Sequence, residues 1–152
     1  MITLFTFVMG LTILNDRYYY FSSFLKSIGN AKHLELIIFT NIRNIFGLPR
    51  NVRIVHINFV QMISTLEAFI GHDLSTLKAH KDFYKVIDLK PFIPAIYSEH
   101  FQKTQWIGWL DNDAWFSSHI FQEIDSLDAN TIDVIRFVNN SWGNFAYLNY
   151  LN

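Results

Sequence analysis

The chain has 152 residues, which is enough for one ordinary domain with a substantial core. Hydrophobic residues make up 51% of it and aromatic residues 17%, which excludes a disordered or low-complexity chain. Twelve basic and 13 acidic residues leave a net charge of −1, too little to hold a nucleic acid backbone, and the lack of cysteine excludes disulfides, thiolate metal sites and cysteine nucleophiles.

The first half of the chain alternates apolar strands with amphipathic helices. Residues 2–9 are β-branched and aromatic and predict a buried strand. Two further strands are predicted over residues 34–40 and 51–58. Apolar residues three and four positions apart predict helices over residues 17–28 and 59–70. The predicted order is therefore β-α-β-β-α.

The second half contains shorter elements. Residues 83–101 are predicted to be mostly helical, with breaks near Pro91 and Pro94. The other predicted elements are a strand over 106–110, a helix over 114–124, a strand over 131–138 and one more strand within 139–152. Strands that alternate with helices indicate an α/β fold, with a mostly parallel sheet flanked by helices, and we expect residues 1–152 to form a single domain.

The apolar N-terminus does not predict a membrane span. Residues 2–14 are almost entirely apolar, but such a stretch is too short to cross a bilayer. It also lacks the basic region that begins a secretory signal, so a secretory role is the weaker alternative. We therefore expect a cytoplasmic protein with no membrane span and no nucleic acid partner.

The most informative polar pattern is Asp111-Asn112-Asp113, directly after the predicted strand 106–110. In an extended segment, two carboxylates at this spacing point to one side of the backbone. At the carboxyl end of a strand in an open α/β sheet, they would face the region where ligands bind. Such hard oxygen ligands suit Mg²⁺ or Mn²⁺ shared with a phosphate. The alternative is a polar turn in which Asp113 caps the next helix.

A second polar pattern consists of Lys85, Asp88 and Lys90, just before Pro91. In a functional interpretation, a lysine contacts a phosphate and the acid holds a sugar hydroxyl. In the alternative interpretation, these residues form a solvated helix face with a local ion pair that contributes little to stability.

Taken in order, these patterns resemble a family of predicted glycosyltransferases. The runs YKVIDLKP (residues 84–91) and WIGWLDNDAWF (residues 106–116) are similar to that family's "PYK-x-x-D-F-K-P" helix start and its "F-W-G-x-x-D-x-D-V-I-F-G" strand and turn. Residues 15–27 and the run LELIIFTN (residues 34–41) resemble its first helix and its "I-x-F-x-x-F-T-D" strand. The resemblance covers residues 1–138 in the right order.

The resemblance implies a Rossmann-like nucleotide-diphosphosugar transferase domain of type A. It implies that Asp111 and Asp113 hold Mn²⁺ or Mg²⁺ on the diphosphate of a UDP- or GDP-sugar donor, and that the acceptor is an unidentified glycan, lipid or protein. Thr6 and Thr40, taken as the ends of the first two strands, would approach the base or ribose. The donor-binding residues implied in this way are Thr6, Thr40, Lys85, Asp88, Lys90 and Asn112.

The chain departs from the family pattern in three places. Asn41 stands where an acid is usual, and Ala-Trp-Phe-Ser at residues 114–117 replaces "V-I-F-G". Residues 139–152 would only begin the acceptor side, so we expect an incomplete fold, and no catalytic base is identified. The leading hypothesis is a metal-dependent glycosyltransferase-like protein. The alternatives are a non-catalytic remnant that acts as a binding module, and a small metal-dependent phosphohydrolase.

Overall fold

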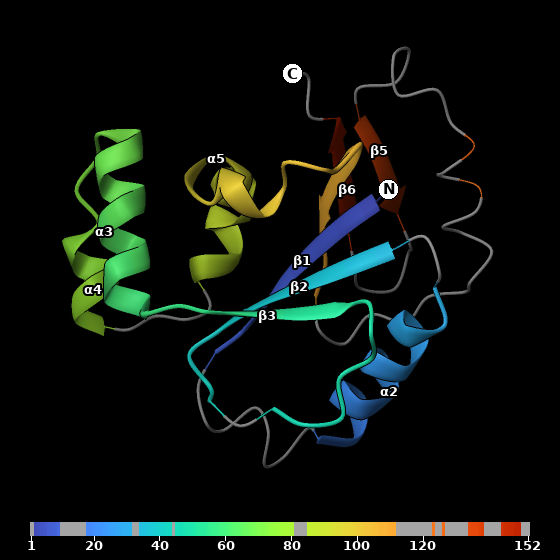
Figure 1. Cartoon of the computed structure of the whole chain (residues 1–152). Helices are drawn as coiled ribbons and strands as arrows, with labels where there is room; N and C mark the ends of the chain where they lie inside the picture. The colour runs from blue at the N-terminus through green and yellow to red at the C-terminus, as the bar shows by residue number, and fades with distance from the viewer. Residues whose placement is uncertain are drawn as a thin grey trace.

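The computed structural model describes residues 2–9, 18–31, 34–43, 45–80, 85–111, 123, 126, 134–138 and 144–149. Its centre is a sheet whose first four strands are all parallel (Figure 1). These strands are β1 (Ile2–Val8), β2 (Leu34–Thr40), β3 (Val52–His56) and β4 (Trp106–Trp109), in the spatial order β3-β2-β1-β4. The predicted α/β class with parallel strands is confirmed.

Two antiparallel strands extend the sheet beyond β4. Strand β6 (Asn144–Asn149) runs antiparallel to β4, and β5 (Val134–Val138) lies outside β6 and antiparallel to it. The strands expected over 131–138 and within 139–152 are therefore present. Residues 144–149 add a strand to the same sheet, and the expectation that residues 139–152 begin an acceptor-binding part stays a prediction.

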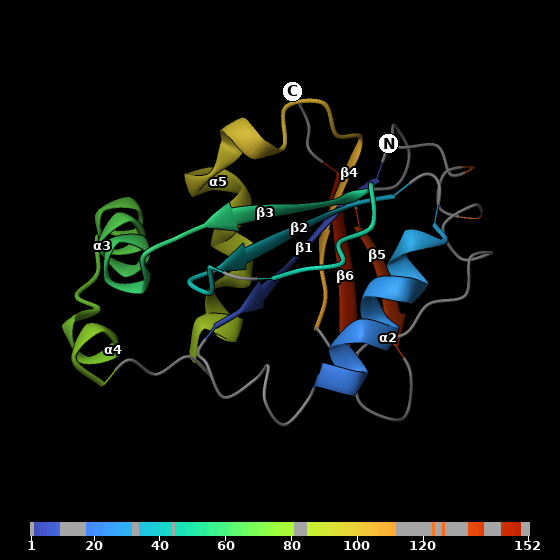
Figure 2. The same ribbon diagram turned by 60° about the horizontal axis from the view of Figure 1, so that its bottom comes forward.

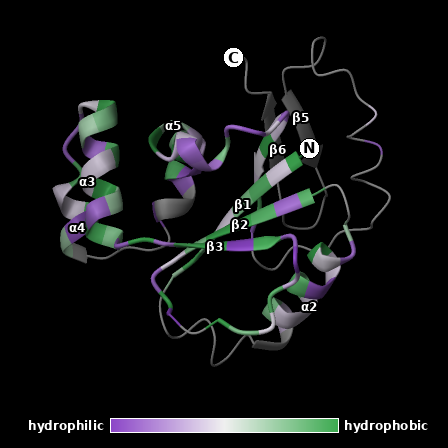
Figure 3. Ribbon diagram, viewed as in Figure 1, coloured by the Kyte–Doolittle hydropathy of each residue, from purple (hydrophilic) through white to green (hydrophobic). Residues whose placement is uncertain are grey.

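Strands β1 and β2 are buried on both sides because helices cover both faces of the sheet. Leu4 packs in a cluster with α2 (Tyr18–Gly29), and its neighbour Phe5 packs in a cluster with α3 (Phe59–Ile70) and α5 (Ile93–Ile96). Figure 2 shows α2 on one side of the sheet and α5 on the other. The hydropathy of β1 and β2, mostly apolar in Figure 3, follows from this double coverage.

Local signals in the sequence fix the ends of α3. The Asn58 side chain accepts a hydrogen bond from the Gln61 backbone N–H at 3.2 Å and so caps the first turn. Gly71 ends the helix in the left-handed conformation, at φ 68°, and its N–H donates to the Glu67 carbonyl. The predicted bounds, 59–70, are confirmed. A further short helix, α4 (Ser75–His80), was not predicted.

The segment before β4 is helical, as predicted, but its breaks differ from those expected. It consists of η1 (Lys85–Phe92), a 3₁₀ helix, then α5, then the short 3₁₀ helix η2 (Ser98–His100). Pro91 lies inside η1 and does not interrupt it. Pro94 lies in the first turn of α5, where a missing N–H leaves no helical hydrogen bond unmade. The predicted helix over 114–124 falls mostly outside the described residues.

The order of the strands creates a topological switch point between β1 and β4. From β1 the chain moves outward through β2 to β3, and it then returns past both strands to place β4 on the other side of β1. In open α/β sheets, ligands bind beyond the carboxyl ends of the strands at such a point. The carboxyl ends concerned are Val8 of β1 and Trp109 of β4.

Candidate functional site

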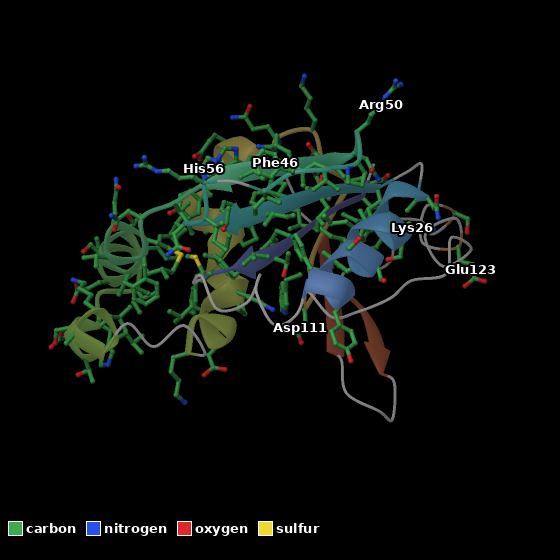
Figure 4. The ribbon with its side chains drawn as sticks, turned by 90° about the horizontal axis from the view of Figure 1, so that it is seen from below. Lys26, Phe46, Arg50, His56, Asp111 and Glu123 are labelled. Carbon is green, nitrogen blue, oxygen red and sulfur yellow. The ribbon has the colours of Figure 1, made fainter. Side chains whose placement is uncertain are left out.

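Asp111 lies two residues beyond the end of β4, at the switch point. The Leu110 N–H donates to the Phe5 carbonyl at 3.1 Å, so the chain stays attached to β1 up to the residue before Asp111. The Asp111 side chain is 47% exposed and is therefore accessible to a ligand. Figure 4 shows it well separated from His56, at the end of β3. The structure therefore places Asp111, the first residue of the acidic pattern, in an accessible position beyond the carboxyl end of β4.

A buried lysine holds that carboxylate. Lys90 is only 3% exposed, and its Nζ lies 2.6 Å from Oδ1 of Asp111 and 3.1 Å from the Leu110 carbonyl oxygen, to both of which it donates. A buried ammonium requires such partners, because an unpaired charge in an apolar environment costs several kcal/mol. The pair links η1 to the end of β4 and fixes the orientation of Asp111.

The surroundings of Lys90 explain why it is buried. Its neighbour Leu89 packs against the core on the α3 and α5 side, and Ile93, one helical turn later, is fully buried in that core. Leu110, whose carbonyl accepts from Lys90, is buried in the core on the α2 side. Lys90 therefore lies at the edge of the sheet between the two cores, one on each face of the sheet, and is buried by both.

The oxygen atoms of Asp111 are of the kind that divalent cations prefer. Within the described part of the chain, no three acidic or imidazole side chains gather in a way that could hold a metal ion. Asn112 and Asp113, the other residues of the predicted pattern, lie outside that part. Asp111 fits a role as one ligand of a cation whose other ligands include substrate oxygens.

Lys85 and Asp88, the other members of the second polar pattern, lie on the exposed surface of η1. Their side chains are 62% and 72% exposed, and Lys85 Nζ is 3.9 Å from Asp88 Oδ2. An exposed ion pair at this distance contributes little to stability. The structure therefore separates the pattern into two parts, an exposed Lys85–Asp88 pair and the buried Lys90.

The two threonines expected near the nucleotide are buried. Strand β1 continues to Val8, so the prediction that Thr6 ends the strand is wrong, and Thr6 is only 1% exposed. Thr40 does end β2, but it is fully buried. Its hydroxyl donates to the Val8 carbonyl at 2.5 Å and accepts from the Ile42 N–H at 3.0 Å. Thr40 thus joins the carboxyl ends of β1 and β2, and its hydroxyl already makes two hydrogen bonds within the protein.

Sequence reasoning missed the pairing of Lys90 with Asp111 and the hydrogen bonds of Thr40. One signal for Lys90 was available, since a single lysine followed by Pro91, Phe92 and Ile93 stands in a largely apolar run. Such a lysine, once buried, needs an acidic partner. No comparable signal existed for Thr40, because a threonine that ends a strand is equally common with its hydroxyl exposed.

Comparison with known protein families identifies one match, a family of unknown function (DUF6625), over residues 16–140. The chain belongs to this family. The DUF6625 match begins after β1, ends after β5 and includes both Lys90 and Asp111. No curated protein and no solved structure matches this DUF6625 chain. Among its described helices, none is both long and apolar enough to cross a membrane.

Proposed function

We propose that this protein is a metal-dependent glycosyltransferase-like protein that binds a nucleotide-sugar donor and transfers the sugar to an acceptor. The observation that carries the proposal is the half-exposed carboxylate of Asp111 beyond the end of β4, held by Lys90 at the switch point between β1 and β4. This is the place where Rossmann-like sheets bind nucleotides and their phosphates. The resemblance to predicted glycosyltransferases narrows the ligand to a UDP- or GDP-sugar.

The proposed site suits the chemistry of sugar transfer. When the bond between the sugar and the diphosphate breaks, negative charge develops on the departing diphosphate. A bound Mn²⁺ or Mg²⁺ supplies Lewis-acid stabilisation of that charge. Asp111, together with Asp113, would hold the ion, and Lys90 keeps the Asp111 carboxylate in one orientation. Lys85 and Asp88, which lie on the exposed surface of η1, would contact the donor.

A thermal-shift series with UDP-, GDP- and CMP-sugars, each with and without Mn²⁺, tests the proposal. A ligand at about one hundred times its Kd stabilises the folded state by about 2.7 kcal/mol. For a domain of this size, that corresponds to a rise in Tm of roughly 5–10 °C. We expect this rise for one nucleotide class, and only in the presence of Mn²⁺.

Two variants make the test specific. Asp111→Asn removes the ligand charge and should abolish the Mn²⁺-dependent shift. Glu99→Gln makes the same chemical change at an exposed carboxylate of η2 and should preserve the shift. An equal shift in wild type and Asp111→Asn, or no shift with any donor, would refute the proposal. Assays for sugar transfer and for release of inorganic phosphate then separate a transferase from a binding module and from a phosphohydrolase.

A further inference from the structure

The Lys90–Asp111 pair carries no net charge. The two charges are 2.6 Å apart, and Lys90 is 3% exposed, so water does little to screen its ammonium from the space around Asp111. A free divalent cation at Asp111 would be attracted by the carboxylate and repelled by an ammonium at nearly the same place. The pair therefore offers a bare cation little net attraction.

A nucleoside diphosphate reverses this balance. The complex of UDP or GDP with a divalent cation is still negatively charged, and that of a UDP- or GDP-sugar is neutral, so the charge of Lys90 attracts the first and does not repel the second, while it repels the bare ion. The phosphate oxygens also supply ligands to the cation, and among the described residues no three acidic or imidazole side chains gather in a way that could hold it without them. Mg²⁺ in particular is usually bound through one or two carboxylates together with substrate phosphates.

We propose that Lys90 makes cation binding at Asp111 depend on the diphosphate, so that the protein takes up the cation only as its complex with the nucleotide. This inference rests on the function proposed above and adds to it the order in which the ligands bind. Lys90 is a positioning residue in this scheme. It is buried against the Leu110 carbonyl and acts through its charge and through Asp111, without a contact to the donor.

Calorimetry on the full chain tests the inference with four probes: Mn²⁺ alone, and Mn²⁺ with pyrophosphate, UDP or GDP. We expect Mn²⁺ to bind wild type at least about tenfold more tightly in the presence of the diphosphate that the protein prefers than it does alone. Lys90→Met should bind free Mn²⁺ about tenfold more tightly and the Mn²⁺–diphosphate complex about tenfold more weakly, because the same charge acts with opposite sign on the two ligands.

Two further variants control for packing and for net charge. Lys90→Gln keeps a hydrogen-bond donor for the Leu110 carbonyl but loses the charge, so it should shift both affinities in the same directions as Lys90→Met. Lys103→Met makes the matched change at an exposed lysine before β4 and should leave both affinities at wild-type values. A thermal melt verifies that each variant is folded. The comparison of Mn²⁺ binding with and without a diphosphate uses wild type alone, so it does not depend on the folding of any variant.

The outcomes separate this inference from the proposed function. If the Lys90 variants weaken both affinities or change neither, while Asp111→Asn still abolishes binding of the complex, the inference is wrong and the function stands. The inference is also wrong if wild type binds Mn²⁺ equally tightly in the absence and in the presence of a diphosphate. If wild type binds no Mn²⁺–diphosphate complex, both proposals fail.

Discussion

Replacing Thr40 with valine tests how the carboxyl ends of β1 and β2 are held together. Valine has nearly the same shape as threonine but no hydroxyl, so it removes the hydrogen bond to the Val8 carbonyl and the acceptor of the Ile42 N–H. Both residues are buried, at 0% and 7% exposure. An unsatisfied buried N–H costs about 1–3 kcal/mol and the loss of one hydrogen bond about 0.5–1.5 kcal/mol, so Thr40→Val should lower the free energy of unfolding by roughly 1.5–4.5 kcal/mol.

The matched variant is Thr40→Ser, which keeps the hydroxyl and loses one methyl group. Burial of a methyl group contributes about 1 kcal/mol, so Thr40→Ser should be clearly more stable than Thr40→Val although valine is the closer match in shape. Urea unfolding followed by circular dichroism measures both values, provided that the m-value stays constant. A Thr40→Val protein at least as stable as Thr40→Ser would refute the assignment of Thr40 as a buried link between the strands.

Three other changes have definite expected results. The Asn51 Nδ2 group donates to the carbonyls of Ile28, Ala31 and Leu34, between the end of α2 and the start of β2. An aspartate carboxylate can only accept, so Asn51→Asp should lower the stability in urea unfolding more than Asn51→Ala does. The pKa of Glu67 is lowered below its usual 4.5, chiefly by the hydrogen bond from Lys78. The ionised Glu67 carboxylate therefore stabilises the folded state above pH 4.5, and this contribution is lost as the pH falls through the lowered pKa. In thermal melts at a series of pH values, the Tm of Glu67→Gln should fall less than that of wild type as the pH is lowered below 4.5. Gly71→Ala should lower unfolding stability by about 1 kcal/mol, and Gly71→Asn by less, because Gly71 has positive φ.

Periodicity in the sequence predicted the individual elements well. Residues 34–40 are bounded as expected because their apolar run stops at the polar Asn41, and residues 59–70 because theirs lies between the Asn58 cap and Gly71. The position of β6 between β4 and β5 was not predictable, since a strand's pattern shows which face is buried and not which strand lies beside it. For the same reason, the pattern gave no indication that these strands run antiparallel to their neighbours.

The candidate site was predictable only in part. Asp111 stood out because it follows an apolar strand, and the structure places it at the carboxyl end of β4. Its partner Lys90 was identified as polar and grouped with Lys85 and Asp88, because the sequence shows neighbours along the chain and not across the fold. Burial then divides that group, since only Lys90 lies against the end of β4.

The pairing of β1 with β4 brings together the first and the last of the four parallel strands in chain order. The hydroxyl oxygens of Thr3 and Thr104, 101 positions apart in the sequence, lie 2.6 Å from each other. Such distant contacts slow folding, because a long loop must close before the contacts can stabilise it. A ribosome-bound chain therefore cannot form the proposed donor site until β4 has been synthesised, and a single proteolytic cut between β1 and β4 would yield two fragments that form this part of the sheet only by reassociating.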